Sequence, residues 1–177
     1  MKMKGNKMGV YYDGAKLPFG DKVLFLHIMK AGTNGKIIID GKKDESGDMN
    51  LKLTTLSDNE EDFQQATVKF YKTYAKSFLQ HKTQYYAQML GVKVNRITIK
   101  SQKTRWGSCS SKGNINYNWK IILMPEIVSD YIVVHELCHL KQMNHSKEFW
   151  MEVERIIPDY LQRKEWLRKS GNDYYMY

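Results

Sequence analysis

The chain has 177 residues, of which 42% are hydrophobic and 27% charged, and its formal net charge is +9 at pH 7. This length fits one domain, or one domain with a modest extension, and allows a sizeable core. No apolar run approaches the roughly 20 residues that a membrane span needs, and no apolar stretch of about 7–15 residues follows the N-terminal lysines, as a secretory signal would require. We therefore expect a soluble cytoplasmic protein.

The basic charge balance, with a pI of about 9.4, bears on the partners of the protein. A positive surface field favours polyanions, so association with DNA through a basic surface is one interpretation. The lysines are spread along the chain, and a basic protein without a nucleic-acid partner is the equal alternative.

The first half of the chain predicts short strands followed by a long helix. Residues 1–15 are polar and lack periodicity, which indicates a flexible tail. Three segments bounded by turn-rich sequence predict a small antiparallel sheet. They are residues 22–29, 36–40 and 49–56. A helix then runs from an N-cap at Ser57 to Gly91. Its aromatic residues recur at roughly helical spacing and are expected in the core: Phe63, Phe70, Tyr74, Phe78 and Tyr85.

The second half predicts a strand, a hairpin and then helices. Residues 92–100 alternate as a strand does, with an offset near Asn95. The hairpin that follows turns at "SSKGN", and Pro125 suits the first turn of a helix. We expect residues 16–90 to form the N-terminal strands and helix. Residues 91–177 would then form the functional core, joined with them in one compact domain.

Three of the five histidines lie within "VVHELCHLKQMNHSKEFW", residues 133–150. His135 and His139 are four residues apart, so a helix places both imidazoles on one face, where they can bind one metal ion. Glu136 is rotated about 100° from His135 and points elsewhere. It can reach a water molecule on the open side of the ion, which is the general-base position of HExxH hydrolases.

A catalytic zinc usually has three protein ligands and one open position. On a continuous helix, His145 would point roughly 240° away from His139, so the helix must end before it. Asn144 can adopt the left-handed conformation of a helix stop, and Ser146 can cap a new helix that ends at Pro158. The sequence thus predicts one Zn²⁺ per chain, bound by the side chains of His135, His139 and His145.

These residues have alternative assignments. HExxH alone can occur by chance on an amphipathic helix, and a third histidine at a helix break makes the match to a metal site more specific. Cys138 is a competing ligand, but helix rotation turns it towards the apolar face. Cys109 and Cys138 match no paired spacing and are expected to be reduced and buried. Without His145, the third ligand would be Cys138 or an acidic residue, namely Glu148, Glu152 or Asp159. His27 and His81 have no partner at ligand spacing and are assigned structural roles.

The segments "TRWGSC", "NINYNWKIILMP", "DYIVVHELCHLKQMNHSKEFW" and the following "PDY" and "WL" resemble the YgjP-like family of bacterial metal-dependent hydrolases. These are relatives of the WLM and SprT-like metalloproteases, which cut proteins attached to DNA. The resemblance covers about residues 85–170. It implies a zincin-like α+β fold, with a small antiparallel sheet, a HExxH active-site helix and C-terminal helices. It also implies zinc ligation by His135, His139 and His145, with Glu136 as the catalytic base.

Two functions follow from these observations. The main hypothesis is a zinc metallopeptidase that hydrolyses peptide bonds of a protein or peptide substrate, including nucleic-acid-associated proteins. The alternative is a nucleic-acid-associated module with a structural or vestigial zinc site and no peptidase activity. Structural zinc usually has four protein ligands, and the sequence offers three, which favours the open catalytic site.

Overall fold

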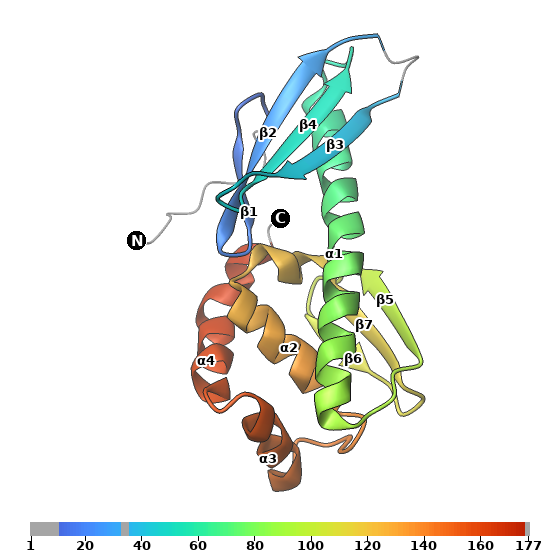
Figure 1. Ribbon diagram of the computed structural model, residues 1–177, viewed down its shortest axis with the longest axis vertical. Coiled ribbons are helices and arrows are strands. Elements are labelled where there is room, and N and C mark those ends of the chain that lie inside the picture. Colours follow the sequence, from blue (N-terminus) through green and yellow to red (C-terminus); the bar gives the residue numbers. More distant parts are fainter. Residues whose placement is uncertain (1–10, 33–35, 176–177) are drawn as a thin grey trace. The chain divides into compact units, whose positions relative to one another are not determined.

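The computed structural model of the protein describes residues 11–32 and 36–175. Residues 1–10 of the tail expected at 1–15 lie outside this part, whereas Tyr11 and Ala15 are buried. The elements, seen in Figure 1, are β1 (Lys16–Phe19), β2 (Lys22–Lys30), β3 (Ile38–Lys43), β4 (Met49–Thr55), α1 (Glu60–Leu90), β5 (Arg96–Lys100), β6 (Gly107–Cys109), β7 (Asn114–Asn118), η1 (Trp119–Leu123), α2 (Glu126–Cys138), α3 (Lys147–Ile156), α4 (Tyr160–Ser170) and η2 (Gly171–Tyr174).

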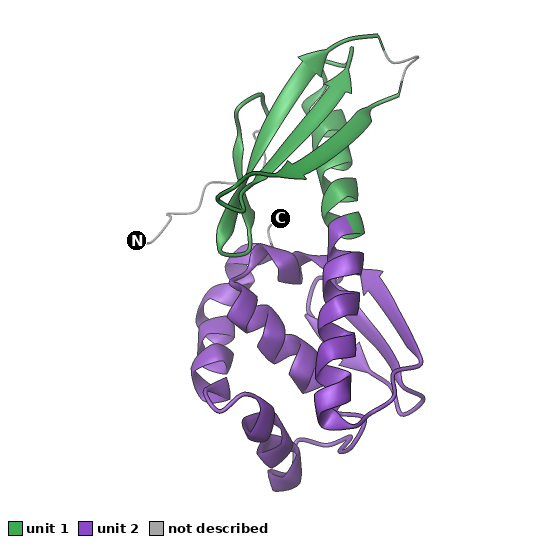
Figure 2. Ribbon diagram, viewed as in Figure 1, with its two compact units in different colours: residues 1–73, 176 green, residues 74–175, 177 purple. Residues whose placement is uncertain are grey.

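The chain divides into two compact units within helix α1 (Figure 2). The described residues up to Thr73 belong to the first unit and Tyr74–Tyr175 to the second. The domain boundaries expected from the sequence, at residues 16–90 and 91–177, stay a prediction.

The first unit contains a sheet in the order β1-β2-β4-β3. Antiparallel pairing was expected throughout; β1 with β2 and β3 with β4 are antiparallel, whereas β2 and β4 are parallel. Strand β4 lies between β2 and β3, and Met49, Leu51 and Leu53 alternate on its buried face. Strand β3 carries exposed polar residues such as Asp40 and Lys42, which suit a sheet edge.

Helix α1 begins at Glu60, later than expected. Its N-cap is Asn59 and not Ser57, because the Oδ1 of Asn59 accepts a hydrogen bond from the N–H of Glu61 at 3.0 Å. The helix ends at Leu90, and Gly91 follows with a φ of 67°, the left-handed conformation that glycine adopts readily.

The buried face of α1 differs from the aromatic stripe expected there. Phe63 is buried, but Tyr85 is 55% exposed. Small and hydroxyl-bearing side chains predominate on the buried face, which lets neighbouring elements approach the helix closely. Besides Phe63, its members are Ala66, Thr67, Tyr71, Ala75, Leu79, Thr83, Ala87 and Leu90. The buried hydroxyl of Thr83 donates to the carbonyl of Leu79 at 2.6 Å, so its polar group is satisfied.

The second unit contains a three-stranded sheet in the order β5-β7-β6. Strands β6 and β7 form the expected antiparallel hairpin, and Gly113 in its turn has a φ of 76°. Strand β5 is shorter than the segment 92–100 and runs parallel to β7. Strand β6 pairs on one side only, so it is an edge strand of the sheet.

Helix α2 is the central helix of the second unit and is buried on most sides. Its buried apolar residues are Val128, Tyr131, Ile132, Val133, Val134, Leu137 and Cys138. Asp130 of α2 forms an ion pair of 2.7 Å with Lys82 of α1, which connects the two helices. The α+β class expected from the sequence, with a HExxH helix followed by further helices, is confirmed. No helix in the described part of the chain is both long and apolar enough to cross a membrane.

Candidate metal centre

The three clustered histidines lie where α2 ends and the chain turns towards α3. Helix α2 ends at Cys138, with His139 as its C-cap residue in right-handed helical conformation, so the helix stops earlier than the expected Asn144. His135 and His139 nevertheless keep helical spacing, because the C-cap residue continues the helical backbone. The following turn closes with the N–H groups of Lys141 and Gln142 donating to the carbonyl of Cys138, each at 3.0 Å.

Ser146 caps α3, as predicted, and its hydroxyl accepts from the N–H of Phe149 at 3.4 Å. The chain therefore changes direction between His139 and Ser146. This turn brings His145 back towards the end of α2, which a continuous helix would prevent.

The structure places the side chains of His135, His139 and His145 together, with one ligand atom of each within 4.8 Å of the others. The Nε2 atoms of His135 and His145 are 3.1 Å apart. Two nitrogens bound to one tetrahedral ion at about 2.05 Å would lie about 3.3 Å apart, so this spacing fits a shared metal ion. His145 is exposed and the other two are half-buried, so one side of the cluster is open to solvent.

The hydrogen bonds and burial of the ring nitrogens also fit a metal site. His139 Nδ1 lies 3.2 Å from the carbonyl oxygen of Gln142, and donation to this oxygen leaves the lone pair on Nε2 free for an ion. Burial, followed by the charges of neighbouring groups, lowers the pKa of His135 to about 3. Burial also lowers the pKa of His139. Both imidazoles are therefore neutral at pH 7, the form that binds metal.

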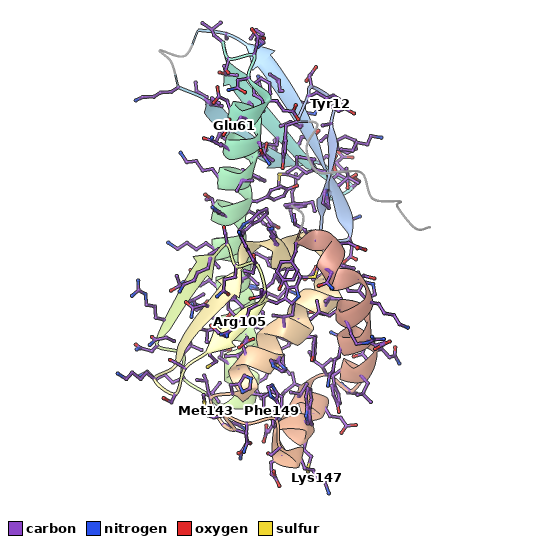
Figure 3. All side chains as sticks on the ribbon, turned by 180° about the vertical axis from the view of Figure 1, so that it is seen from behind. Tyr12, Glu61, Arg105, Met143, Lys147 and Phe149 are labelled. Atoms are coloured by element: carbon purple, nitrogen blue, oxygen red, sulfur yellow. The ribbon has the colours of Figure 1, made fainter. Side chains whose placement is uncertain are left out.

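Phe149 of α3 packs against the rings of all three histidines. Its side chain is fully buried, and its ring centroid lies 4.7–5.0 Å from the centroids of all three imidazoles. Figure 3 labels Phe149 at the point where α2 and α3 approach each other. This packing restricts the ring positions of the three histidines.

Glu136, the predicted base, is 6% exposed and lies against strand β6. A Cβ atom placed on Gly107 would lie only 2.5 Å from the Oε1 of Glu136. Only glycine therefore fits beside the carboxylate in its present position. Burial raises the pKa of Glu136 to about 8, and a cation nearby would lower it. The contact with Gly107 was missed in the sequence, although "WGSC" was noted as part of the family resemblance.

The competing ligands do not join the cluster. Cys138 is fully buried, and burial raises the pKa of its thiol to about 12, which disfavours the thiolate needed for zinc binding. The acidic alternatives have other surroundings: Glu148 is exposed, while Glu152 and Asp159 pair with basic side chains. Cys109, expected to be buried, is half-buried, and both cysteines are free.

Two polar residues of the hairpin, Tyr117 and Asn118, make structural contacts. Tyr117 is fully buried, and its hydroxyl lies 3.1 Å from that of Thr83. Asn118 is also buried, and its Nδ2 donates to the carbonyls of Gln102 and Arg105 at 2.8 and 3.2 Å. These contacts hold the segment before β6 in place.

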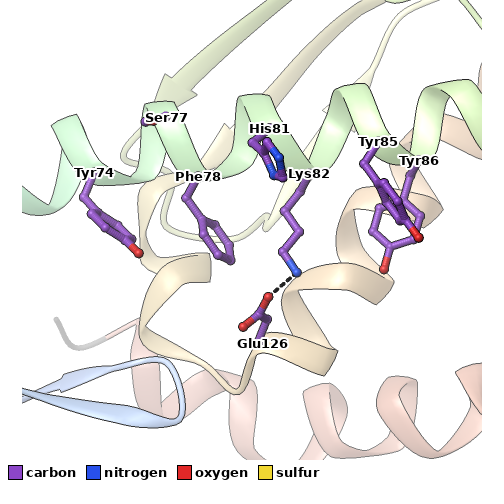
Figure 4. A pocket seen from close by; sticks show the side chains of 8 residues that line it. All are labelled: Tyr74, Ser77, Phe78, His81, Lys82, Tyr85, Tyr86 and Glu126. Atoms are coloured by element: carbon purple, nitrogen blue, oxygen red, sulfur yellow. Dashed lines mark hydrogen bonds and ion pairs between the residues drawn. The ribbon is translucent and has the colours of Figure 1, made fainter. Parts of the chain in front are cut away.

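A separate hollow of about 480 Å³ lies on α1 of the second unit (Figure 4). Tyr74, Phe78 and Tyr86 line it, and Lys82 reaches across to Glu126 at the start of α2. His81 also lines this hollow and is outside the histidine cluster. None of the three clustered histidines lines the hollow, nor does Glu136.

Comparison with known proteins places these features in a family. A family model described as "YgjP-like, metallopeptidase domain" matches residues 10–170. Among solved structures, the chain is similar to the metallopeptidase zymogen abylysin of Pyrococcus abyssi, with 26% sequence identity and a TM-score of 0.47 over 52% of this chain and 92% of that one. No curated protein matches the sequence.

Proposed function

Because the chain belongs to the YgjP-like metallopeptidase family, which makes it a metal-dependent peptidase, we propose that it hydrolyses peptide bonds with one zinc ion held by His135, His139 and His145. The observation that carries this proposal is the convergence of three imidazoles, one of which is next in sequence to the buried carboxylate of Glu136. Neutral imidazole nitrogens at this spacing suit zinc. A metal with a stronger preference for oxygen ligands would find no carboxylate within this cluster.

The residues of the chain have distinct roles in the proposed reaction. When bound, zinc acts as a Lewis acid that polarises the scissile carbonyl and makes water a nucleophile at neutral pH. Glu136 accepts the proton of the attacking water and delivers it to the leaving amine, so its carboxylate must be ionised at the start. The three histidines remain neutral ligands, and Phe149 keeps their rings in place.

Strand β6 offers a surface for an extended substrate. The carbonyl of Trp106 accepts from the N–H of Asn118, and the N–H of Ser110 donates to the carbonyl of Asn114, which fixes the pairing with β7. Because hydrogen-bonding directions alternate along a strand, the backbone groups of Gly107 and Cys109 point towards the unpaired edge. A substrate backbone added at this edge would lie beside Glu136.

The alternative function, a structural zinc site without peptidase activity, has less support. In the described residues, the only cluster able to hold a metal ion consists of three side chains. A structural zinc site usually has four protein ligands, so this cluster lacks one. The exposed side of His145 leaves room for water and substrate.

The proposal is tested by replacing Glu136 with Gln. The variant should keep one zinc per chain, measured by elemental analysis, and lose at least about 10²-fold in the cleavage rate of an unfolded protein, because general-base catalysis contributes about 10²–10⁴-fold. Glu148→Gln removes an exposed carboxylate of α3 and serves as the control, with full activity expected. Wild-type cleavage by the Glu136 variant would refute the proposal.

A further inference from the structure

The positive charge of the protein is concentrated in one segment. Residues 63–125 contain eleven lysines and arginines and no aspartate or glutamate, while the net charge of the whole chain is +9. The rest of the chain is therefore slightly acidic. The lysines and arginines of this segment do not form a continuous block. The segment is basic because it contains no acidic residues.

The part of this segment that follows α1 contains the β5–β7–β6 sheet, and the two faces of this sheet differ. The buried Tyr117 contacts Thr83 of α1, so the residues in register with it face that helix. Alternation places a second set of side chains on the opposite, outer face. They are Arg96, Thr98 and Lys100 of β5, Asn114, Asn116 and the buried Asn118 of β7, and Ser108 of β6.

The middle of the outer face is a row of uncharged donors. Thr98, Asn116 and Ser108 are neighbours in the register of the three strands. The Nδ2 of Asn116 donates to the hydroxyl of Ser108 at 3.1 Å, which confirms that both lie on the same face. Viewed from behind, no helix crosses this sheet (Figure 3). The aromatic residue on this face is Trp106, whose carbonyl accepts from the N–H of Asn118 and whose ring stacks on that of Tyr175, with centroids 4.1 Å apart.

Cationic residues lie at both ends of this row. At one end, the N–H groups of Asn95 and Arg96 donate to the carbonyl of Gly113, at 2.8 and 3.4 Å, which brings the hairpin turn with Lys112 beside Arg96. At the other end, next to Lys100, the bonds of Asn118 hold the segment that carries Arg105.

These cations are available to a partner. Arg96, Lys100, Lys103, Arg105 and Lys112 are all exposed. In the described part of the chain, no ion pair involves any of them. A polar row with unpaired cations at both ends provides the donors that contact phosphate oxygens in DNA complexes.

We propose that the outer face of the β5–β7–β6 sheet binds the phosphate backbone of double-stranded DNA. Duplex DNA presents about one negative charge per 1.7 Å of its axis, which suits several separated cations. The ring of Trp106 already stacks on Tyr175, and the face offers no row of aromatic side chains, which disfavours single strands, whose binding depends on stacking of successive bases. Within the described residues, this face consists of the three strands without a helix that could enter a groove, so binding should be independent of sequence.

The position of this face gives DNA binding a consequence for catalysis. Ser108 lies on the outer face of β6, while its neighbour Gly107 contacts Glu136. A protein substrate attached to the bound DNA would therefore lie near the candidate metal centre. This link to the substrate rests on the proposed peptidase function, whereas DNA binding itself does not.

The test measures binding of the full chain to a fluorescent duplex of about 30 base pairs over roughly 25–300 mM salt. The logarithm of the affinity should fall linearly with the logarithm of the salt concentration. The double variant Arg96→Gln/Lys100→Gln should make that slope less negative by about 1.8, since each phosphate contact contributes about 0.9. Lys42→Gln/Lys52→Gln removes equal charge from exposed residues of the first unit and should leave the slope unchanged.

Several results would overturn the proposal. These are binding that ignores salt, equal losses in the two double variants, single-stranded DNA that binds as tightly as the duplex, or an acidic polypeptide that competes as well as DNA. Cleavage of an unattached peptide should be the same in the Arg96/Lys100 variant as in the wild type. Failure of DNA binding can thus be distinguished from failure of the peptidase assignment.

Discussion

Replacing Gly107 with Ala tests whether strand β6 positions the general base. The added Cβ would lie 2.5 Å from the Oε1 of Glu136 and 2.7 Å from its Cδ and Cγ. Ordinary van der Waals contact begins near 3.4 Å, so the carboxylate must move by about 0.9 Å. Gly107 is not in the left-handed region, so alanine can adopt its backbone conformation and the clash is the main perturbation.

The displaced atoms are the end of a flexible side chain, so the fold should survive while the base moves. A displacement of about 1 Å can lower a catalytic rate by about 10²-fold, which corresponds to about 2.7 kcal/mol in the activation free energy. We expect kcat for an unfolded protein substrate to fall by this factor. Zinc content should remain at one ion per chain, because the three atoms nearest to the added Cβ all belong to Glu136 and not to a histidine.

The matched control is Gly32→Ala, since a Cβ at Gly32 meets no atom within 4 Å. It should leave both kcat and zinc content unchanged. Wild-type kcat in the Gly107 variant would refute the reasoning. Parallel loss of zinc and activity would refute it as well, since that result would indicate disruption of the metal site and not displacement of Glu136.

Two further predictions concern the metal ion. His145→Ala should lower zinc content after dialysis well below one ion per chain. The unfolding temperature of the metal-free protein should not change, because His145 is exposed. Unchanged zinc content would contradict the assignment of His145 as a ligand. Glu136 is protonated at pH 7 in the metal-free protein, because burial raises its pKa to about 8. Zinc lowers that pKa, so titration calorimetry in buffers of different ionisation enthalpy should detect proton release on zinc binding, and Glu136→Gln should abolish it.

The features that the sequence predicted well depend on short-range geometry. The spacing of His135 and His139 follows from the helical repeat, and the cap at Ser146 follows from the hydrogen bond of a serine side chain to a nearby N–H. The predicted helix end was wrong, because α2 stops at Cys138 and the sequence had indicated Asn144. Several residues in that turn are compatible with ending a helix, and packing selects among them.

The remaining features depend on residues far apart in the chain. The sequence alone determined that three histidines and a glutamate could form a metal centre, because these residues lie within one short segment. Only the tertiary structure decided that Gly107 contacts Glu136, that β4 pairs in parallel with β2, and that Arg96 and Lys100 share one sheet face. The physical reason is that strand order and side-chain packing are set by burial of apolar surface across the whole fold, which local periodicity does not encode.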